Sequence, residues 1–313
     1  MKPLKATLLI ALSLAGALFL IINRFPITKT TTSSSSSRFV FLQNLLLLAQ
    51  NFLPWFGLLS IFFIFLAFLY RKQKAAILLL AFPLVAALMF IPQLLPTKAN
   101  TASNALTVAT SNIDADNKDP QAAVQSIIAQ NADLVGIEEL EGTAGEEVVS
   151  AMNAAYPYNH VFGTVALWSK YPITDGEAAD MPTNYGRVLT SEVDLPQGKT
   201  QVYVSHMGSY RPSEHAQRDE MLDQISQVMK TDPNDKAIIM GDFNASTYDS
   251  HFQEVLHAWP ETKNEHFGMG FTWPTFFPAT KIDHVFYKGF TNGTSHTFTA
   301  QGSDHKAIKA TIS

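Results

Sequence analysis

Residues 238–246 join three apolar residues to a glycine, a carboxylate and a carboxamide, in the order Ile-Ile-Met-Gly-Asp-Phe-Asn-Ala-Ser. The apolar run predicts a short buried strand that stops at Gly241, where the backbone can turn without a Cβ penalty. Alternate residues of a strand face the same way, so Asp242 and Asn244 should face one site if strand geometry continues past Gly241. Open α/β sheets carry their chemistry at such strand ends. Asp and Asn are also ordinary turn residues, so a solvated turn is an alternative for this stretch taken alone.

Other predicted strands also carry, at one end, side chains that can bind metal ions or move protons. These side chains are Asn112, Glu139, His206, Asp283 with His284, and Asp304 with His305. Each has an ordinary structural explanation, because a buried His is usually a satisfied core residue and a Glu at a strand end is usually solvated. With the strand that ends at Asp242, chance would have to act six times, so we expect these strand ends to meet in one polar site.

The elements that position these side chains can be predicted from residues 101–313. Asp119-Pro120 predicts a helix N-cap followed by Pro at the first helical position, and a Pro-Gln-Gly turn predicts a hairpin of strands 187–194 and 200–206. The remaining predicted strands are 106–113, 133–140, 165–168, 282–287 and 306–312, and the predicted helices are 120–130, 146–155, one from a cap at Ser213 through 229, and one near 249–257. This mixture of hairpins and crossovers predicts an α/β fold, a four-layer sandwich of two packed mixed β-sheets flanked by helices.

Charge divides the chain into two parts. Residues 1–100 contain nine Lys or Arg and no Asp or Glu, whereas residues 101–313 contain 13 Lys or Arg and all 27 Asp and Glu, a balance of −14. An acidic domain disfavours nucleic acid as its main ligand, although a bound divalent cation would offset part of the charge. The chain has no cysteine, which excludes disulfides and thiolate metal sites.

The first hundred residues predict a membrane anchor. Residues 6–22, 39–70 and 75–95 are uncharged and long enough to cross a bilayer, so we expect three transmembrane helices, with a kink at Pro83 in the third. The anchor would occupy residues 1–96 and a polar linker residues 97–105, followed by the catalytic domain over 106–313. The first span could instead be a cleaved signal sequence.

Lys and Arg in the short loops predict the orientation of this anchor. Lys2 and Lys5 precede the first span, and Arg71, Lys72 and Lys74 follow the second, which places both on the cytoplasmic side. Arg24, Lys29 and Arg38 argue weakly for the reverse, but they are spread along a Ser/Thr-rich loop. We therefore expect a multi-pass protein of the cytoplasmic membrane with its acidic domain outside.

The ordered set of motifs resembles the endonuclease/exonuclease/phosphatase family of divalent-metal phosphoesterases, over roughly residues 105–313. The matching motifs are Ser-Asn-Ile with Asn112, Asp-Leu-Val-Gly-Ile-Glu-Glu-Leu with Glu139, Val-Ser-His with His206, Gly-Asp-Phe-Asn, Lys-Ile-Asp-His with Asp283, and Gly-Ser-Asp-His. Residues 168–173 are also similar to the family's Ser-Arg-Tyr-Pro-Ile segment. The chain departs from the family at Glu138, where Gln is usual, and strand alternation should point Glu138 away from Glu139.

The resemblance implies a role for each matching residue. Glu139, Asn112 and Asp304 would hold Mg²⁺ or Mn²⁺, since oxygen ligands suit these ions. Asp242 would orient and deprotonate the attacking water, and Asn244 would hold water or phosphate. His305, oriented by Asp283, would act as base or stabilise the charged phosphorane, and His206 would bind a phosphate oxygen. Whether Asp242 or His305 takes the proton from water stays open.

The roles of the neighbouring residues are less specific. His284 is expected to pack in the core, because it should face the opposite way from Asp283. Arg187 and Arg218 could each bind phosphate or form a surface salt bridge. Residues 271–274, Phe-Thr-Trp-Pro, could line the substrate cleft or simply pack within a loop.

These features together predict a membrane-anchored phosphohydrolase. Its substrate would be a lipid phosphate or pyrophosphate, because tethering to the bilayer raises the effective concentration of a lipid. An exported nuclease or phosphodiesterase is the alternative within the same class, disfavoured by the charge of −14 over residues 101–313. A catalytically silent membrane-anchored binding domain is the alternative from another class. No protein partner is evident in the sequence.

Overall fold

The computed structural model describes residues 3–22, 50–70, 75–209 and 215–313. By its internal contacts the chain divides into two units. The first comprises Met1–Leu95 with Tyr248–Ser250, and the second comprises Pro96–Thr247 with His251–Ser313. The predicted cap at Ser213 and the basic residues of the two loops of the anchor, from Arg24 to Arg38 and from Arg71 to Lys74, lie outside the described residues.

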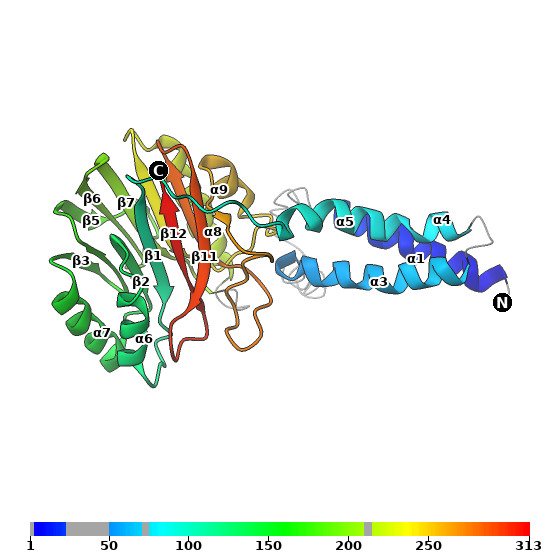
Figure 1. Ribbon diagram of the computed structural model, residues 1–313, viewed down its shortest axis with the longest axis horizontal. Helices are drawn as coiled ribbons and strands as arrows, with labels where there is room; N and C mark the ends of the chain where they lie inside the picture. The colour runs from blue at the N-terminus through cyan, green and yellow to red at the C-terminus, as the bar shows by residue number, and fades with distance from the viewer. Residues whose placement is uncertain (1–2, 23–49, 71–74, 210–214) are drawn as a thin grey trace. The chain divides into compact units, whose positions relative to one another are not determined.

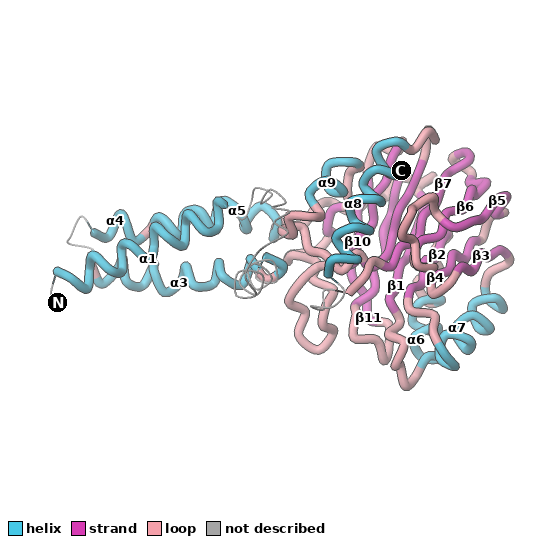
Figure 2. Tube along the Cα trace, turned by 180° about the vertical axis from the view of Figure 1, so that it is seen from behind, coloured by secondary structure: helices cyan, strands magenta, loops and turns pink. Residues whose placement is uncertain are grey.

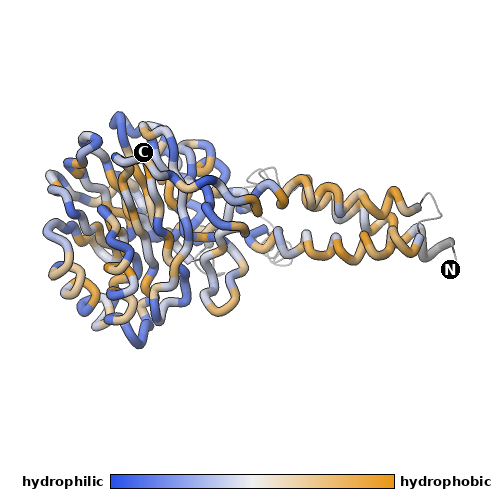
Figure 3. The backbone as a smooth tube through the Cα atoms, viewed as in Figure 1, coloured by the Kyte–Doolittle hydropathy of each residue, from blue (hydrophilic) through white to orange (hydrophobic). Residues whose placement is uncertain are grey.

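The first unit consists of apolar helices. Its helices are α1 (Pro3–Ile22), α3 (Leu53–Leu69), α4 (Ala75–Leu79) and α5 (Ala81–Leu94), and Figure 3 shows the described parts of α1, α3 and α5 as largely hydrophobic. Among the described residues one segment, Ala76–Leu94, is long and apolar enough to cross a membrane, and Thr7–Ile21 and Leu53–Leu69 are shorter apolar helices. The prediction of three spans is therefore not confirmed, and part of the second predicted span lies outside the described residues.

The interruption between α4 and α5 follows from Pro83. Proline has no N–H, so the carbonyl of Leu79 loses its helical donor and the helix breaks at Leu80. Ser13 of α1 replaces that donor: its Oγ donates to the Leu79 carbonyl at 3.0 Å and accepts from the Phe82 N–H at 3.3 Å. An apolar environment tolerates a freed backbone carbonyl when a neighbouring hydroxyl satisfies it in this way.

The second unit contains two mixed β-sheets. The larger is ordered β3 (Tyr158–Phe162), β4 (Val165–Ser169), β2 (Leu134–Glu138), β1 (Leu106–Asn112), β12 (Lys306–Ile312), β11 (Gly293–Thr299) and β9 (Lys263–Asn264). The smaller is ordered β10 (Asp283–Lys288), β8 (Ala237–Asp242), β7 (Gly198–His206), β6 (Val188–Leu195) and β5 (Ile173–Ala178). Parallel pairing joins β1 to β2, β9 to β11 and β7 to β8, and the other pairs are antiparallel.

Three separate hydrophobic cores make four layers of these elements. Val108 of β1 packs with Val204 and Met240 in the core between the sheets, whereas the next residue, Ala109, faces α6 (Pro120–Ile128) and α7 (Gly142–Ala155). A third core joins the smaller sheet to α8 (His215–Thr231) and α9 (Gln253–Ala258). Figures 1 and 2 show α6 and α7 beside the larger sheet and α8 and α9 beside the smaller one. The predicted α/β fold of two packed mixed sheets flanked by helices is confirmed.

Local sequence signals mark some elements well and others poorly. Asp119 caps α6, since its Oδ1 accepts from the Ala122 N–H at 3.1 Å, and β6 and β7 form the predicted hairpin. The strands β3, β5, β9 and β11 were not predicted, because β3 and β5 are largely exposed edges without a buried apolar face and β9 is only two residues long. The predicted linker, residues 97–105, forms no helix or strand, yet it is hydrogen-bonded to the domain through Thr97 and Asn100.

The strand β8 does not stop at Gly241, as predicted, but continues to Asp242. Gly241 lies opposite Ser205 of β7 and His284 of β10, with a φ of 140°. A Cβ at this position would lie 1.9 Å from the carbonyl oxygen of Ser205. The glycine is therefore required by the close approach of β7 rather than by a turn.

Replacing Gly241 with alanine is expected to destabilise the chain by at least about 2 kcal/mol, since backbone strain and a steric clash add. Gly198→Ala is the matched control: its φ of 111° is also positive, but nothing lies within 4 Å of its Cβ. The control should lose only about 1–2 kcal/mol of its free energy of unfolding, which is the cost of a positive φ for alanine. Thermal unfolding of the full chain in detergent measures both, and equal losses in Tm would show that the approach of Ser205 does not matter.

Candidate active site

The strand pairing brings the predicted site residues to one end of the two sheets. In the smaller sheet Asp242 lies opposite His206 on the parallel strand β7 and opposite Asp283 on the antiparallel strand β10. The carboxyl ends of parallel strands meet at one edge, and an antiparallel neighbour contributes its first residue there. In the larger sheet Asn112 ends β1 and Glu139 directly follows β2, which is paired in parallel with β1. Register therefore explains why distant segments converge within each sheet, and the packing of the two sheets brings the two sets together.

Asp242 lies at the centre of this cluster and is buried. Its Oδ2 accepts from Nδ2 of Asn112 at 3.0 Å, and the same amide donates to Oε1 of Glu139 at 2.9 Å. His206 Nε2 lies 3.4 Å from Oε1 of Glu139 and 4.0 Å from Oδ2 of Asp242. Burial raises the pKa of Asp242 to about 7 and lowers the pKa of His206 to about 4. Near pH 7 His206 is therefore neutral, and Asp242 can exchange a proton.

His305 approaches the same carboxylate from the other sheet. Its Nε2 lies 3.9 Å from Oδ2 of Asp242, and its Nδ1 lies 3.0 Å from Oδ2 of Asp283. Burial by itself lowers the pKa of His305, but the charges of Asp283 and Asp242 outweigh it and raise that pKa to about 10. Ser303 fixes the loop, since its Oγ donates to the Asn112 carbonyl at 2.7 Å and accepts from the His305 N–H at 2.9 Å.

Asn244 reaches the site by a turn and not by strand alternation. Its φ is 47°, its N–H donates to Oδ1 of Asp242 at 2.8 Å, and its Nδ2 donates to Oδ2 of Asp242 at 3.2 Å. Arg218 of α8 is buried and donates through Nη1 to the carbonyl of Asn244 at 3.0 Å. Of the two alternatives predicted for Arg218, an ion pair is present, with Asp219, but it is buried rather than at the surface. Arg218 also holds the turn that carries Asn244.

Asp304 lies beside this cluster, with its carboxylate half exposed. Its Oδ1 is 3.8 Å from His305 Nε2, and its Oδ2 accepts from Nε1 of Trp273 at 2.9 Å. Within the described residues, the metal-binding groups whose ligand atoms lie within 4.8 Å of one another are Glu139 with His206 and Asp242, and Asp242 with Asp283 and His305. Asp304 belongs to neither group and is a neighbour of the cluster. The predicted ligands Asn112 and Glu139 are adjacent and hydrogen-bonded to each other.

Asp114 lies near Asp304 and Glu139 and was not predicted from the sequence. Its burial, with the nearby charges of Asp304 and Glu139, raises the pKa of its carboxyl. Asp114, Glu139 and Asn244 are three of the five non-glycine residues with positive φ in the described chain, and such strained backbone concentrates at functional sites. The spacing Asn112-Ile113-Asp114 was a signal, since residues two apart at a strand end can face one site.

A divalent cation fits the donors at this end of the sheets. Asn112, Glu139, Asp114 and Asp304 supply the amide and carboxylate oxygens that hard cations prefer. Burial is the main cause that raises the pKa of the carboxyls of Asp114 and Asp242, and repulsion from neighbouring carboxylates adds a smaller effect. Mutual repulsion of this kind is relieved when a cation binds.

Glu138 is buried behind the site and does not join it. Its Oε1 accepts from Oγ1 of Thr110 at 2.6 Å, and its Oε2 has no hydrogen-bond partner among the described residues. Burial raises the pKa of Glu138 well above its ordinary value, which favours the neutral acid over the carboxylate. The structure gives no reason to replace Glu139 by Glu138 as a ligand.

His284 is fully buried, as predicted, but it also positions the active-site loop. Its Nε2 donates to the carbonyl of Ala245 at 2.9 Å, and its Nδ1 lies 2.7 Å from Oε1 of Glu261. Phe252 packs on the ring at a centroid distance of 4.7 Å. Burial opposes ionisation of Glu261, but Lys281 and His284 outweigh it and lower the pKa of Glu261 to about 2. These contacts anchor the segment that follows Asp242.

The Glu261 contacts predict a loss of stability in acid. A carboxyl with a depressed pKa stabilises the fold fully above its unfolded pKa of 4.5 and progressively less as pH falls toward 2. The side chain is 19% exposed, so the full contribution should be on the order of 3 kcal/mol. We expect Glu261→Gln to be less stable than the parent chain at pH 7, and the gap in Tm to narrow at pH 3. A gap that is unchanged with pH would contradict this assignment.

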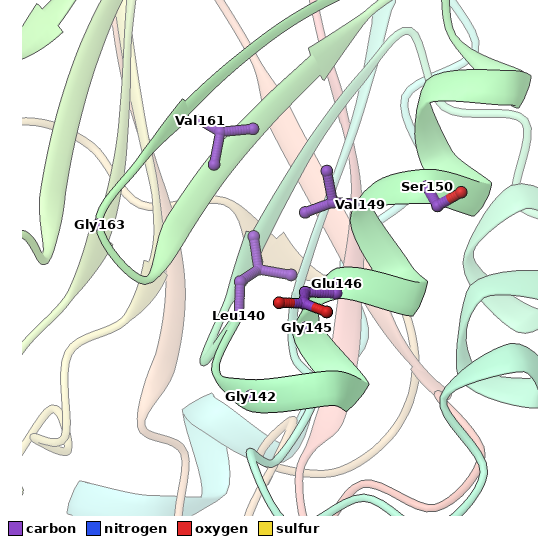
Figure 4. A pocket seen from close by; sticks show the side chains of 8 residues that line it. All are labelled: Leu140, Gly142, Gly145, Glu146, Val149, Ser150, Val161 and Gly163. Carbon is purple, nitrogen blue, oxygen red and sulfur yellow. The ribbon is translucent and has the colours of Figure 1, made fainter.

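A hollow of about 390 Å³ lies next to the site, between the start of α7 and the turn that joins β3 to β4. Figure 4 shows Leu140, Val149 and Val161 around it, with Glu146 nearby. None of the predicted catalytic or metal-binding residues lines it. The hollow is therefore separate from the polar cluster.

The sequence and the fold both resemble those of known proteins. The model of the Endonuclease/Exonuclease/phosphatase family matches residues 109–305, and no curated protein matches the chain. Beta toxin from Staphylococcus aureus with bound magnesium ions is 19% identical with a TM-score of 0.55, over 66% of this chain and 99% of that one. Sphingomyelinase C from Streptomyces griseocarneus is 16% identical with a TM-score of 0.53, over 67% and 99%.

A DNA-bound structure has a similar fold. TDP2 of D. rerio complexed with a single-strand DNA product is 17% identical with a TM-score of 0.51, over 67% of this chain and 100% of that one. At these identities the likeness concerns the fold alone. The matched part of this chain is two thirds of its length and corresponds to the whole of each neighbour.

Proposed function

The chain belongs to the endonuclease/exonuclease/phosphatase family and is a metal-dependent phosphoesterase, and from this premise we propose that it hydrolyses a lipid phosphate or pyrophosphate at a membrane surface. The observation that carries the chemistry is the convergence on Asp242. Its buried carboxylate lies within 4.0 Å of both His206 and His305 and accepts hydrogen bonds from Asn112 and Asn244. Proton transfer and phosphate binding can therefore take place around one atom, Oδ2 of Asp242.

The protonation states assign a different catalytic role to each of these side chains. Asp242, with a pKa of about 7, takes the proton of the attacking water, because His305 already holds a proton up to about pH 10. The positive charge of His305 stabilises the negative charge that develops on the phosphoryl group. His206 is neutral at pH 7, and its Nε2 can donate to a phosphate oxygen. Asn244 positions the water.

Asn112, Glu139 and Asp304, with Asp114 beside them, would hold Mg²⁺ or Mn²⁺. The ion, when bound, neutralises charge on the phosphoester oxygens. Asn112 links this ligand set to the proton-transfer residues, because its amide donates to both Glu139 and Asp242.

The lipid substrate is supported by the apolar helices of the first unit. The segment Ala76–Leu94 can cross a membrane, and the apolar helices α1 and α3 would complete the anchor of three spans. Lys2 and Lys5, which precede the first predicted span, and the Lys and Arg residues that follow α3 would face the cytoplasm, so the acidic domain would lie outside the cytoplasmic membrane. Tethering near the headgroups favours a lipid over a soluble substrate.

The test is a hydrolysis screen with the full chain in lipid nanodiscs. Phosphate release from lipid phosphates and pyrophosphates is compared with nicking of plasmid DNA, with EDTA and after Mg²⁺ or Mn²⁺ is restored. We expect EDTA to abolish activity, the ions to restore it, and Glu139→Gln to stay inactive with either ion. Faster cleavage of DNA than of every lipid phosphate would exclude the lipid assignment and favour a nuclease.

Arg187 is expected to bind the substrate phosphate. No hydrogen bond or ion pair joins its guanidinium to another residue of the described chain, and its positive charge contributes to the lowered pKa of His206. Arg187→Gln should lower kcat/KM about 10- to 100-fold through a raised KM, and should leave Tm unchanged. Steady-state kinetics measures the effect, with Lys230→Gln, which breaks an exposed ion pair with Glu254, as the control. A loss confined to kcat would contradict the role in binding.

A further inference from the structure

Residues 267–280 form an uncharged aromatic stretch in an acidic domain. They read Phe-Gly-Met-Gly-Phe-Thr-Trp-Pro-Thr-Phe-Phe-Pro-Ala-Thr and contain four Phe, one Trp, and no Asp, Glu, Lys or Arg. Phe276 is 90% exposed and Phe267 is 74% exposed. A single exposed apolar residue needs no explanation, but aromatic side chains gathered on one uncharged segment mark an interaction surface.

Part of this stretch is a small hairpin that is attached to the active site. Trp273 and Thr280 form an antiparallel bridge, and each N–H donates to the other's carbonyl at 3.0 Å, so Phe276 lies in the turn between them. At the base of the hairpin Trp273 Nε1 donates to Oδ2 of Asp304 at 2.9 Å, and the N–H of Thr275 donates to the Asp304 carbonyl at 2.7 Å. The exposed ring therefore lies on a segment that is hydrogen-bonded to a predicted metal ligand.

The chain that follows the apolar helix α5 is bonded to the start of the same connection. The Thr97 N–H donates to the carbonyl of Asn264 at 2.8 Å, and Asn264 Nδ2 donates to the carbonyl of Gly268 at 2.9 Å. Only Leu95 and Pro96 separate α5 from Thr97. The polypeptide that leaves the candidate span thus joins the domain at the connection that carries Phe267 and Phe276.

We propose that residues 267–280 dock on the lipid bilayer, with Phe267 and Phe276 inserted at the boundary of headgroups and acyl chains. This docking rests on the proposed membrane anchor. Aromatic rings at this boundary lie about 5–10 Å into the bilayer, so the attached Asp304 would be held at the level of the headgroup phosphates. The uncharged stretch also lets a domain with a charge of −14 approach an anionic surface with the least repulsion.

The experiment uses the absence of cysteine in the chain. Single-cysteine variants F276C, L88C and Y158C of the full chain carry an environment-sensitive fluorophore in phosphatidylcholine vesicles, with and without doxyl-labelled phosphatidylcholine. Leu88 is an exposed residue of the candidate span, and Tyr158 is an exposed aromatic residue of β3. We expect doxyl lipid to quench F276C and L88C at least about twofold more than Y158C.

The outcomes separate this docking from the anchor on which it rests. Quenching of L88C without quenching of F276C overturns the docking and leaves the anchor standing. If neither L88C nor F276C is quenched, both the anchor and the docking are wrong. Neither result concerns hydrolysis, which is measured separately with a soluble phosphodiester as substrate.

A second measurement tests the consequence for catalysis. The double variant F267S/F276S should raise KM for a lipid phosphate in vesicles about tenfold, and should leave kcat/KM for a soluble phosphodiester within about twofold. Equal losses with both substrates would show that the rings support the fold rather than the bilayer contact. An unchanged KM for the lipid would also overturn the proposal.

Discussion

An Asp242→Asn variant is expected to lose about 10²- to 10⁴-fold in kcat/KM, because it removes the group that takes the proton of water. Asparagine has nearly the same shape, so the N–H of Asn244 can still donate to Oδ1 at position 242. The buried carboxylate is costly to ionise, as its raised pKa shows, so its removal should not lower Tm. Steady-state kinetics and thermal unfolding of the same preparation separate the two effects.

The pH dependence of kcat/KM distinguishes the loss of a catalytic base in Asp242→Asn from unfolding of the variant. Asp242 must be unprotonated to act, and burial raises its pKa to about 7, so kcat/KM of the parent chain should rise with pH up to about 7. The variant should lack this rising limb. Asp232→Asn is the matched control, since it changes a buried carboxylate that accepts from Tyr203 Oη at 2.7 Å and from Lys288 Nζ at 3.3 Å. Control and test variants with the same activity would refute the assignment.

The sequence predicted the convergence of the site because convergence depends on strand ends. An apolar run ending in a polar residue identifies both the strand and its terminus, and once β7, β8 and β10 pair, His206, Asp242 and Asp283 must be neighbours. The same reasoning failed for Asn244, which it placed near Asp242 for the wrong reason. The position of Asn244 depends on a positive φ and a hydrogen bond to the Asp242 side chain, and the alternation of residues along a strand predicts neither.

Contacts between distant segments were beyond the sequence patterns. Arg218 was expected at the surface, but it is buried. Its guanidinium can be buried because it donates to the carbonyl of Asn244 and to the carboxylate of Asp219. Trp273 reads as loop packing or a cleft wall, and only the fold shows that its indole holds Asp304. Each of these side chains acts through a partner that a local pattern cannot identify.

The exposed edge strands were missed for a different reason. The strand β5 has five exposed residues of six, so it has no alternating apolar face from which a strand could be predicted. Backbone pairing with β6 holds it in place. Propensity and periodicity report burial, so an edge strand with little buried surface leaves a weak signal.

Asp283 is expected to act entirely through His305, which predicts non-additive losses. His305→Gln should lower kcat about 10²- to 10⁴-fold, since it removes the charged donor near the phosphoryl group. Asp283→Asn should cost less, because the imidazole remains. The double variant should be no worse than His305→Gln alone, because the contribution of Asp283 disappears with the ring it orients. Kinetics of the three variants in one double-mutant cycle measures the coupling, and additive losses would mean that Asp283 contacts the substrate itself.

The pH dependence of Asp283→Asn provides a readout that a merely structural role would not change. The negative charge of Asp283 is the largest of the effects that raise the pKa of His305, and they act against burial, which lowers it. Without that charge the pKa of His305 should fall from about 10, so the ring should lose its proton at a lower pH. The alkaline limb of the kcat profile should therefore move toward neutral pH in this variant. A limb that stays in place would show that the proton on His305 does not depend on Asp283, although Nδ1 lies 3.0 Å from its carboxylate.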